Sequence, residues 1–306
     1  GGYYATADGE DPQVAAALAQ QYRPGHAGDA LPGSTTGTAL AMADRLDTMV
    51  GCFGIGLEPT GTKDPFALRR AAIGILRMAI EKQAHLDLPE MARRAYRAYG
   101  DRLERGEAET VDAVVDFLNG RLDPMYGEGG NDAVRDDVTR PALEVAREHL
   151  TWGVSSPDKP QVEAILSLRP TDPYDAHLRL QGLKALLAHP NAEALISANK
   201  RIGNILRKAE EAVPETYDAA ALAEPAEQAL AEAFDGVRSR AREAAEAGDY
   251  TTALLALAEL REPADRFFDE VLVMAEDDAV RRNRLALLGT VHGAFLQVAD
   301  LSRLPG

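Results

Sequence analysis

The sequence predicts an all-α protein, and three observations support this fold class. Alanine, leucine, glutamate and arginine dominate the 306 residues, and aromatic residues make up only 6% of them. Apolar residues recur mostly at intervals of three and four positions, which is the spacing of one helix face, and strand-like alternation is scarce. The pairs Asp11-Pro12 and Asp64-Pro65 are typical of helix starts, with aspartate as the N-cap and proline at the first helical position.

Turn residues divide the first half of the chain into helices. The segment 23–37 is rich in turn residues, and a glycine-rich loop is expected from Gly51 to Gly61. Pro124, followed by several glycines, marks a break in the helical pattern. The helices expected in this half cover residues 11–21, 36–50, 64–83, 88–100, 108–119 and 132–150.

The second half is predicted to be a run of longer helices, punctuated by Pro190, Pro214, Gly248 and Pro263. The alanine- and glutamate-rich segment 219–246 keeps spaced apolar residues, so we expect a solvated helix there. A shift in composition over residues 160–190 predicts a domain boundary. The helices expected in this half cover residues 173–188, 191–212, 218–247, 249–260, 262–275 and 278–299.

The size of the chain and its single cysteine bound what kind of protein this is. A length of 306 residues suffices for roughly two domains. Cys52 has no partner for an internal disulfide, and the sequence contains neither a signal segment nor an apolar run near the roughly 18 residues that span a bilayer. We therefore expect a cytoplasmic protein. The chain opens with glycine and lacks an initiator methionine, which favours a piece of a longer polypeptide.

The formal net charge of −16 argues against a generally basic, nucleic-acid-binding surface. Net charge describes solubility and non-specific binding better than it describes one site. The position of the 33 lysines and arginines is therefore more informative than their number.

Two short motifs bear on catalysis, and neither is convincing. The run from Gly56 to Lys63 resembles a phosphate-binding P-loop, but Thr62 separates the second glycine from the lysine and no strand is expected before it. A structural glycine loop between two helices is the better interpretation. Asp44 and Asp47 lie one helical turn apart and could form a metal or acid/base pair, although carboxylates bonded to neighbouring arginines such as Arg45 explain them better.

The other residue types that catalyse reactions or bind metals are scattered. Cys52 lacks an obvious base, and no serine lies in a Gly-x-Ser-x-Gly motif. No two histidines are four residues apart, and none forms a His-Asp dipeptide. The six histidines are His26, His85, His149, His177, His189 and His292. We expect no catalytic residue and no metal ligand in this chain.

Basic residues gather on two of the expected helices. On helix 191–212 they occupy one face, opposite apolar residues that include Leu195 and Ile202. Such a face could lie along an RNA backbone, or it could be an ordinary solvated face paired with Glu210 and Glu211. The last helix opens with three arginines, although the helix dipole disfavours cations there. The candidate RNA-binding residues are Lys200, Arg201, Asn204, Arg207 and Lys208 on the first helix, and Arg281, Arg282 and Arg284 on the second.

Several longer blocks, in order along the chain, closely resemble the beta subunit of the bacterial two-subunit (alpha2beta2) glycyl-tRNA synthetase family. Together they span most of the sequence, so the resemblance is far more specific than any short motif above. The blocks are Gly9-Glu-Asp-Pro12, Leu31-Pro32 with Thr36-Gly37, Leu40-Ala-Met-Ala-Asp44-Arg-Leu-Asp47-Thr48, Val50-Gly-Cys-Phe-Gly-Ile-Gly56, Pro59 to Ala72, Ala198-Asn-Lys-Arg-Ile-Gly-Asn-Ile-Leu206, Phe267 to Asp277, and Arg282-Asn-Arg-Leu-Ala-Leu-Leu288.

The resemblance implies two helical domains and a role in holding glycine tRNA. Residues 1–122 resemble the later part of an HD-like helical domain, and residues 173–306 resemble a helical-bundle, DALR-like anticodon-binding domain. The segment 123–172 departs from the family pattern and is expected to be a linker or insertion. In this family the alpha subunit performs ATP-dependent aminoacylation, so ATP and Mg²⁺ are expected there and no cofactor here. The implied partners are glycine tRNA and the alpha subunit, with no membrane.

Two alternative functions remain open from the residues. An HD-type metal-dependent phosphohydrolase would need a His-Asp pair with a further histidine and aspartate, of which Asp44 or Asp47 could match only the last. A scaffold that holds a partner subunit would need no RNA-binding surface. The two basic clusters favour tRNA binding, because the resemblance places both in the anticodon-binding region.

Overall fold

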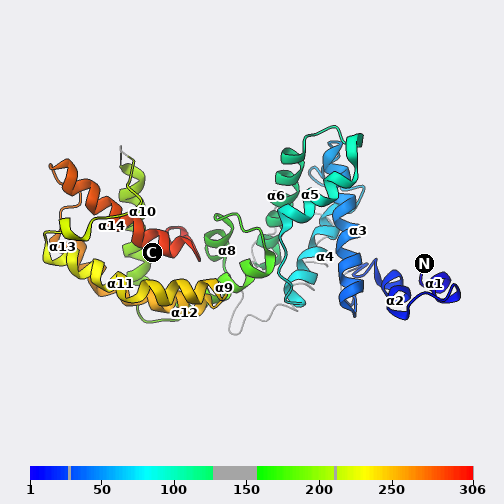
Figure 1. The fold of residues 1–306 in the computed structure, drawn as a ribbon, viewed down its shortest axis with the longest axis horizontal. Coiled ribbons are helices and arrows are strands. Elements are labelled where there is room, and N and C mark those ends of the chain that lie inside the picture. The colour runs from blue at the N-terminus through cyan, green and yellow to red at the C-terminus, as the bar shows by residue number, and fades with distance from the viewer. Residues whose placement is uncertain (27–28, 127–156, 210–211, 306) are drawn as a thin grey trace. The chain divides into compact units, whose positions relative to one another are not determined.

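A computed structural model describes residues 1–26, 29–126, 157–209 and 212–305, and they form helices joined by turns (Figure 1). The strand-type pairing within these ranges is one isolated bridge between Thr60 and Lys63. The prediction of an all-α fold is confirmed. The chain divides into two compact units: unit 1 comprises Gly1–Val162 with Arg169–Asp175, and unit 2 comprises Glu163–Leu168 with Ala176–Gly306. The helix expected at 132–150 lies outside the described residues.

Unit 1 is built around one long helix, α3, which packs against α2, α4, α5 and α6. Its core includes Met49, Phe53, Ile75 and Leu118, and the Phe53 and Phe117 rings meet edge to face with centroids 5.2 Å apart. The first six helices are α1 Gly2–Ala7, α2 Pro12–Gln20, α3 Thr35–Gly54, α4 Leu68–Glu81, α5 Leu88–Ala98 and α6 Glu107–Tyr126.

Helix α3 extends four residues beyond Val50, so the expectation that Gly51 opens a loop is wrong. Both glycines in this last turn lie where another segment approaches closely. A Cβ atom on Gly51 would collide with the Tyr99 ring, and one on Gly54 would lie 2.8 Å from a Leu103 methyl group. Their function is therefore close packing inside a helix rather than chain reversal.

Helix α4 begins at Leu68 rather than at Pro65, which corrects its expected start. Ala67 adopts a left-handed conformation with φ 54°, so the helix cannot extend back to Asp64. The Asp64 carboxylate still accepts hydrogen bonds from the backbone N–H groups of Leu68 and Arg69, at 2.8 and 3.0 Å. Asp64 thus still caps the free N–H groups of the helix, although the helix starts three residues later than the sequence suggests.

Pro124 does not end the helix, because α6 continues through it to Tyr126, and the glycines of the expected break lie outside the described residues. Pro124, Met125 and Tyr126 are all buried, so packing holds the end of the helix in place despite the missing backbone donor of proline. Two short helices, α1 and α8, lie where no helix was expected. They are too short to show a clear hydrophobic period.

The remaining helices form unit 2 and the crossing from unit 1. Helix α11 packs against α12, α13 and α14, and α10 packs against α13 and α14. These helices are α8 Lys159–Leu166, α9 Pro173–Leu187, α10 Ala192–Lys208, α11 Pro225–Glu246, α12 Tyr250–Leu257, α13 Arg261–Glu270 and α14 Asp278–Leu296. None of the helices in the described ranges combines the length and the apolar character needed to cross a membrane.

Helix α11 starts at Pro225, seven residues later than expected, because Glu227 closes its first turn. The Glu227 carboxylate accepts hydrogen bonds from the backbone N–H groups of Ala223 and Glu224, both at 2.9 Å. Its other oxygen pairs with the guanidinium of Arg284 on α14. Arg284 also donates to the carbonyl of Leu272 at 2.8 Å. Residues 219–221 form only a 3-10 turn, capped by Asp218.

The ion pair between Glu227 and Arg284 is buried, with the two residues 2% and 7% exposed. Removing one partner of such a pair leaves an uncompensated charge, so we expect Arg284→Ala to lower the free energy of unfolding by about 3–5 kcal/mol. The double variant Glu227→Gln/Arg284→Met should lose less, since no charge is stranded. Urea unfolding with an unchanged m value measures both effects.

Arg240→Ala is the matched control for this experiment, because Arg240 forms an exposed ion pair with Glu259. Exposed pairs contribute about 0–1 kcal/mol. An Arg284→Ala variant as mild as Arg240→Ala would show that the buried pair does not hold unit 2 together.

His177 on α9 predicts a pH dependence of stability. Its side chain is 6% exposed, and burial lowers its pKa from 6.5 to about 4. Between these values the unfolded chain takes up a proton that the folded chain does not, so the free energy of unfolding falls as pH drops, by at most about 1.4 kcal/mol per pH unit. His177→Gln should remove this component. Urea midpoints from pH 7 to 4 test it, and parallel curves for the two proteins would contradict it.

Candidate nucleic-acid interface

Helix α10 is amphipathic, and its polar side carries the first candidate cluster. The apolar face, which includes Leu195, Ile196 and Ile202, is buried against α13 and α14. The opposite side is formed by Lys200, Arg201, Asn204, Arg207 and Lys208, which we call the α10 basic face. Lys200 is half-buried and the other four are exposed. The tertiary structure thus leaves all five predicted side chains on one accessible surface.

One residue of the α10 basic face is held by an aromatic ring. The guanidinium of Arg201 lies 4.3 Å from the ring centroid of Phe268 on α13. This cation–π contact orients the planar group without neutralising its charge. Arg201 is therefore both anchored and exposed, as a residue that stacks on a base or binds a phosphate needs to be.

The cations of this face are not neutralised by carboxylates within the described part of the chain. Lys200, Arg201, Arg207 and Lys208 form no ion pair there. Glu210 and Glu211, which would make this an ordinary solvated face, lie outside the described residues. Arg207 and Lys208 also occupy the last helical turn, where the helix dipole favours positive charge.

The second candidate cluster, at the start of α14, does not form one surface. Arg282 is exposed. Arg281 is half-buried and donates to the carbonyl of Ala275 at 2.9 Å and to the carboxylate of Asp278 at 2.7 Å. Arg284 is in the core, paired with Glu227. The expectation that Arg284 contacts RNA is therefore corrected: its guanidinium is buried and bonded within the fold, and of the three arginines only Arg282 and part of Arg281 are accessible from outside.

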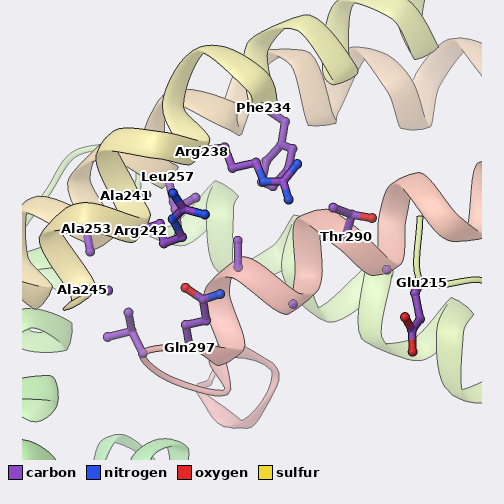
Figure 2. A pocket seen from close by; sticks show the side chains of 14 residues that line it. Glu215, Phe234, Arg238, Ala241, Arg242, Ala245, Ala253, Leu257, Thr290 and Gln297 are labelled. Atoms are coloured by element: carbon purple, nitrogen blue, oxygen red, sulfur yellow. The ribbon is translucent and has the colours of Figure 1, made fainter. Parts of the chain in front are cut away.

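A cavity of about 370 Å³ lies between α11, α12 and α14, and no sequence motif indicated it (Figure 2). Arg238 and Arg242 extend from α11, and Thr290 and Gln297 come from α14 and its C-terminal end. The two arginines lie in the segment interpreted from sequence as a solvated helix. Their spacing of four residues places them on one helix face, and this is the signal that could have identified them.

The candidate chemical groups of unit 1 are engaged in structure. Asp44 and Asp47 are exposed, and the Asp47 carboxylate accepts a hydrogen bond from the Tyr99 hydroxyl at 3.1 Å. Burial raises the pKa of Tyr99 to about 12. Arg45 does not bond to Asp44 as expected but is buried, donating to the carbonyls of Gln21, Tyr22, Pro24 and Ala41. Burial also raises the pKa of the Cys52 thiol. Across the described ranges, no three His, Cys, Asp or Glu residues are grouped as a metal site would need.

The loop from Gly56 to Lys63 connects α3 and α4 and stabilises the start of α4. Lys63 is exposed, and its backbone pairs with that of Thr60. The guanidinium of Arg69 donates to the carbonyl of Gly61 at 2.6 Å. These contacts fit a structural loop between two helices, which is the interpretation that the sequence favoured over a P-loop.

Comparison with known proteins agrees with the helical architecture of both units. The sequence model described as glycyl-tRNA synthetase beta subunit matches residues 1–140, and that of the DALR anticodon binding domain matches residues 195–301. The second match includes α10, α11 and α14 almost completely. The DALR-like domain inferred from the resemblance is therefore confirmed over this range.

Curated relatives named glycine–tRNA ligase beta subunit match nearly the whole chain. Those of Pseudomonas aeruginosa (strain LESB58) and Delftia acidovorans are 44% identical over 304 residues, which is 99% of this chain and 40% and 39% of the relatives. That of Actinobacillus pleuropneumoniae serotype 7 is 45% identical over the same length. The chain thus spans about 40% of the length of these relatives. The chain is therefore similar to the glycyl-tRNA synthetase beta subunit over nearly its whole length, and residues 195–301 match the DALR anticodon binding domain.

Proposed function

We propose that this chain is the tRNA-binding part of a glycine–tRNA ligase, acting in the cytoplasm. In this proposal it holds the anticodon arm of glycine tRNA, and the alpha subunit performs aminoacylation with ATP and Mg²⁺. The observation that carries the proposal is the α10 basic face, a row of exposed or half-buried cations without carboxylate partners among the described residues, inside the matched anticodon binding domain.

The charge distribution supports this role despite the net charge of −16. Contacts between cations and phosphates release counterions, so a few well-placed lysines and arginines contribute most of the salt-dependent affinity. Exposed acidic residues elsewhere repel RNA from other surfaces. They would therefore confine binding to the α10 basic face and its surroundings.

The RNA that suits the α10 basic face is single-stranded or looped. Unpaired bases can be splayed out and stacked on planar side chains, which a regular RNA helix does not permit. Arg201, with its guanidinium held against the Phe268 ring, offers such a plane beside the phosphate-binding cations. The arrangement therefore suits the anticodon loop better than the paired stems.

The experiment that tests this function removes three cations of the α10 basic face, with Lys200→Ala, Arg207→Ala and Lys208→Ala combined. We expect glycine tRNA binding to weaken, because fewer phosphates are neutralised. The slope of log K against log salt should flatten by about 0.7–0.9 for each phosphate that the variant no longer neutralises. Fluorescence anisotropy titrations between roughly 50 and 200 mM salt, where such effects are large, measure both quantities.

The matched control removes three arginines of α5 in unit 1, with Arg93→Ala, Arg94→Ala and Arg97→Ala combined. Both triple variants remove three positive charges, so the change in net charge is the same. The three α5 arginines differ because they are paired with acidic residues, and they are partly or largely exposed. Equal reductions of affinity in both triple variants would mean that only net charge matters. A chain that captures the alpha subunit but binds no tRNA at any salt would instead be a scaffold.

A further inference from the structure

The cavity in unit 2 is lined by both polar and apolar side chains (Figure 2). Its polar lining residues, which we call the rim, are Arg238 and Arg242 from α11, Thr290 and Gln297 from α14 and its C-terminal end, and Glu215 from the segment before α11. The other lining residues are small or apolar, namely Phe234, Ala241, Ala245, Ala253, Leu257, Gly289, Gly293, Ala294 and Val298. Small-molecule pockets share this combination of apolar walls and a few polar groups.

Gly293, one of the residues that line the cavity, has open space where a side chain would lie. A Cβ atom placed on Gly293, in the last turn of α14, would meet no other atom within 4 Å. Glycine inside a helix is less stable than alanine, and packing does not demand it here. A larger side chain at this position would therefore occupy part of the cavity.

The two arginines on the rim are available to a ligand. The Arg242 side chain is 57% exposed, and its Nε lies 3.6 Å from the carboxylate of Glu246 in an i,i+4 ion pair. Arg238 is exposed, with its guanidinium 5.9 Å from the centroid of the Phe234 ring. The intervening Arg240 does not line the cavity and pairs with Glu259 at 2.6 Å. Helical spacing therefore selects Arg238 and Arg242 for the rim.

Groups that can read the edge of a base lie on the same rim. Gln297 is exposed, and within the described residues its side-chain amide makes no hydrogen bond, so both its donor and its acceptor are available. The Thr290 hydroxyl donates to the carbonyl of Ala286 at 2.8 Å, which leaves its oxygen free to accept. The Glu215 carboxylate adds a further acceptor at the mouth.

We propose that this cavity binds one unpaired nucleotide of the tRNA. The base enters the small-residue interior beside Leu257 and Val298, Arg238 and Arg242 hold the flanking phosphates, and Gln297 meets the base edge. This assignment rests on the proposed function and extends it, because the α10 basic face supplies charge while the cavity supplies selection among bases. A volume of about 370 Å³ is near the lower end of the roughly 300–1,000 Å³ of ligand pockets, which suits one nucleotide.

The test fills the cavity with Gly293→Leu and pairs this change with RNA that lacks single bases. The RNA probes are glycine tRNAs carrying an abasic nucleotide at one anticodon-loop position at a time. For the unaltered chain, one abasic position should weaken binding about tenfold, which is the effect of removing one stacked base. Gly293→Leu should bind intact tRNA about tenfold more weakly and show no further decrease at that position, since the leucine already excludes the base.

Gly236→Leu is the control for this substitution, because Gly236 is an exposed α11 glycine whose Cβ would also meet nothing within 4 Å. It should leave affinity and the abasic pattern unchanged. A second pair of variants avoids dependence on a folded Gly293→Leu protein: Arg242→Gln should weaken binding, whereas Arg240→Gln on the same helix should not. Thermal unfolding of each variant verifies the fold.

The outcomes separate this inference from the proposed function. Additive effects of Gly293→Leu and every abasic position, or equal effects of Arg242→Gln and Arg240→Gln, would overturn the nucleotide pocket while tRNA binding stands. Absence of tRNA binding by the unaltered chain, at any salt concentration, would overturn the proposed function itself.

Discussion

The arrangement of unit 2 depends on one buried ion pair, between Glu227 of α11 and Arg284 of α14. Glu227 closes the first turn of α11 through the N–H groups of Ala223 and Glu224 and binds Arg284 with its other oxygen. Arg284 in turn holds the carbonyl of Leu272. Three segments are thereby joined at one point, and the geometry is strict because each buried charge must be satisfied. From this point α11 and α14 continue to the residues that line the cavity.

An acidic chain can still present a local surface of unpaired cations. The net charge is −16, but several basic residues are used internally, as Arg45 and Arg284 are, and others pair with carboxylates. The α10 basic face differs because its cations have no carboxylate partner among the described residues. Local arrangement therefore matters more than average charge, since screening restricts exposed charges to a range of about 8–10 Å.

Much of the fold could be predicted from the sequence, and the errors share a cause. The helical period, Asp11 as an N-cap and the long helices of the second half follow from local preferences. The errors arose where a distant contact overrode them. Gly51 packs under Tyr99, and Pro124 is held in a buried helix end. Periodicity within one segment contains no information on such contacts.

The candidate site divides in the same way. The sequence by itself determined the amphipathic α10, because the positions of its lysines and arginines relative to Leu195 and Ile202 follow from 3.6 residues per turn. Only the tertiary structure decided that Arg284 is internal and that Arg238 and Arg242 border a cavity. The reason is physical: a helix period shows which residues share a face, but the partner that covers this face is set by packing between segments distant in the chain.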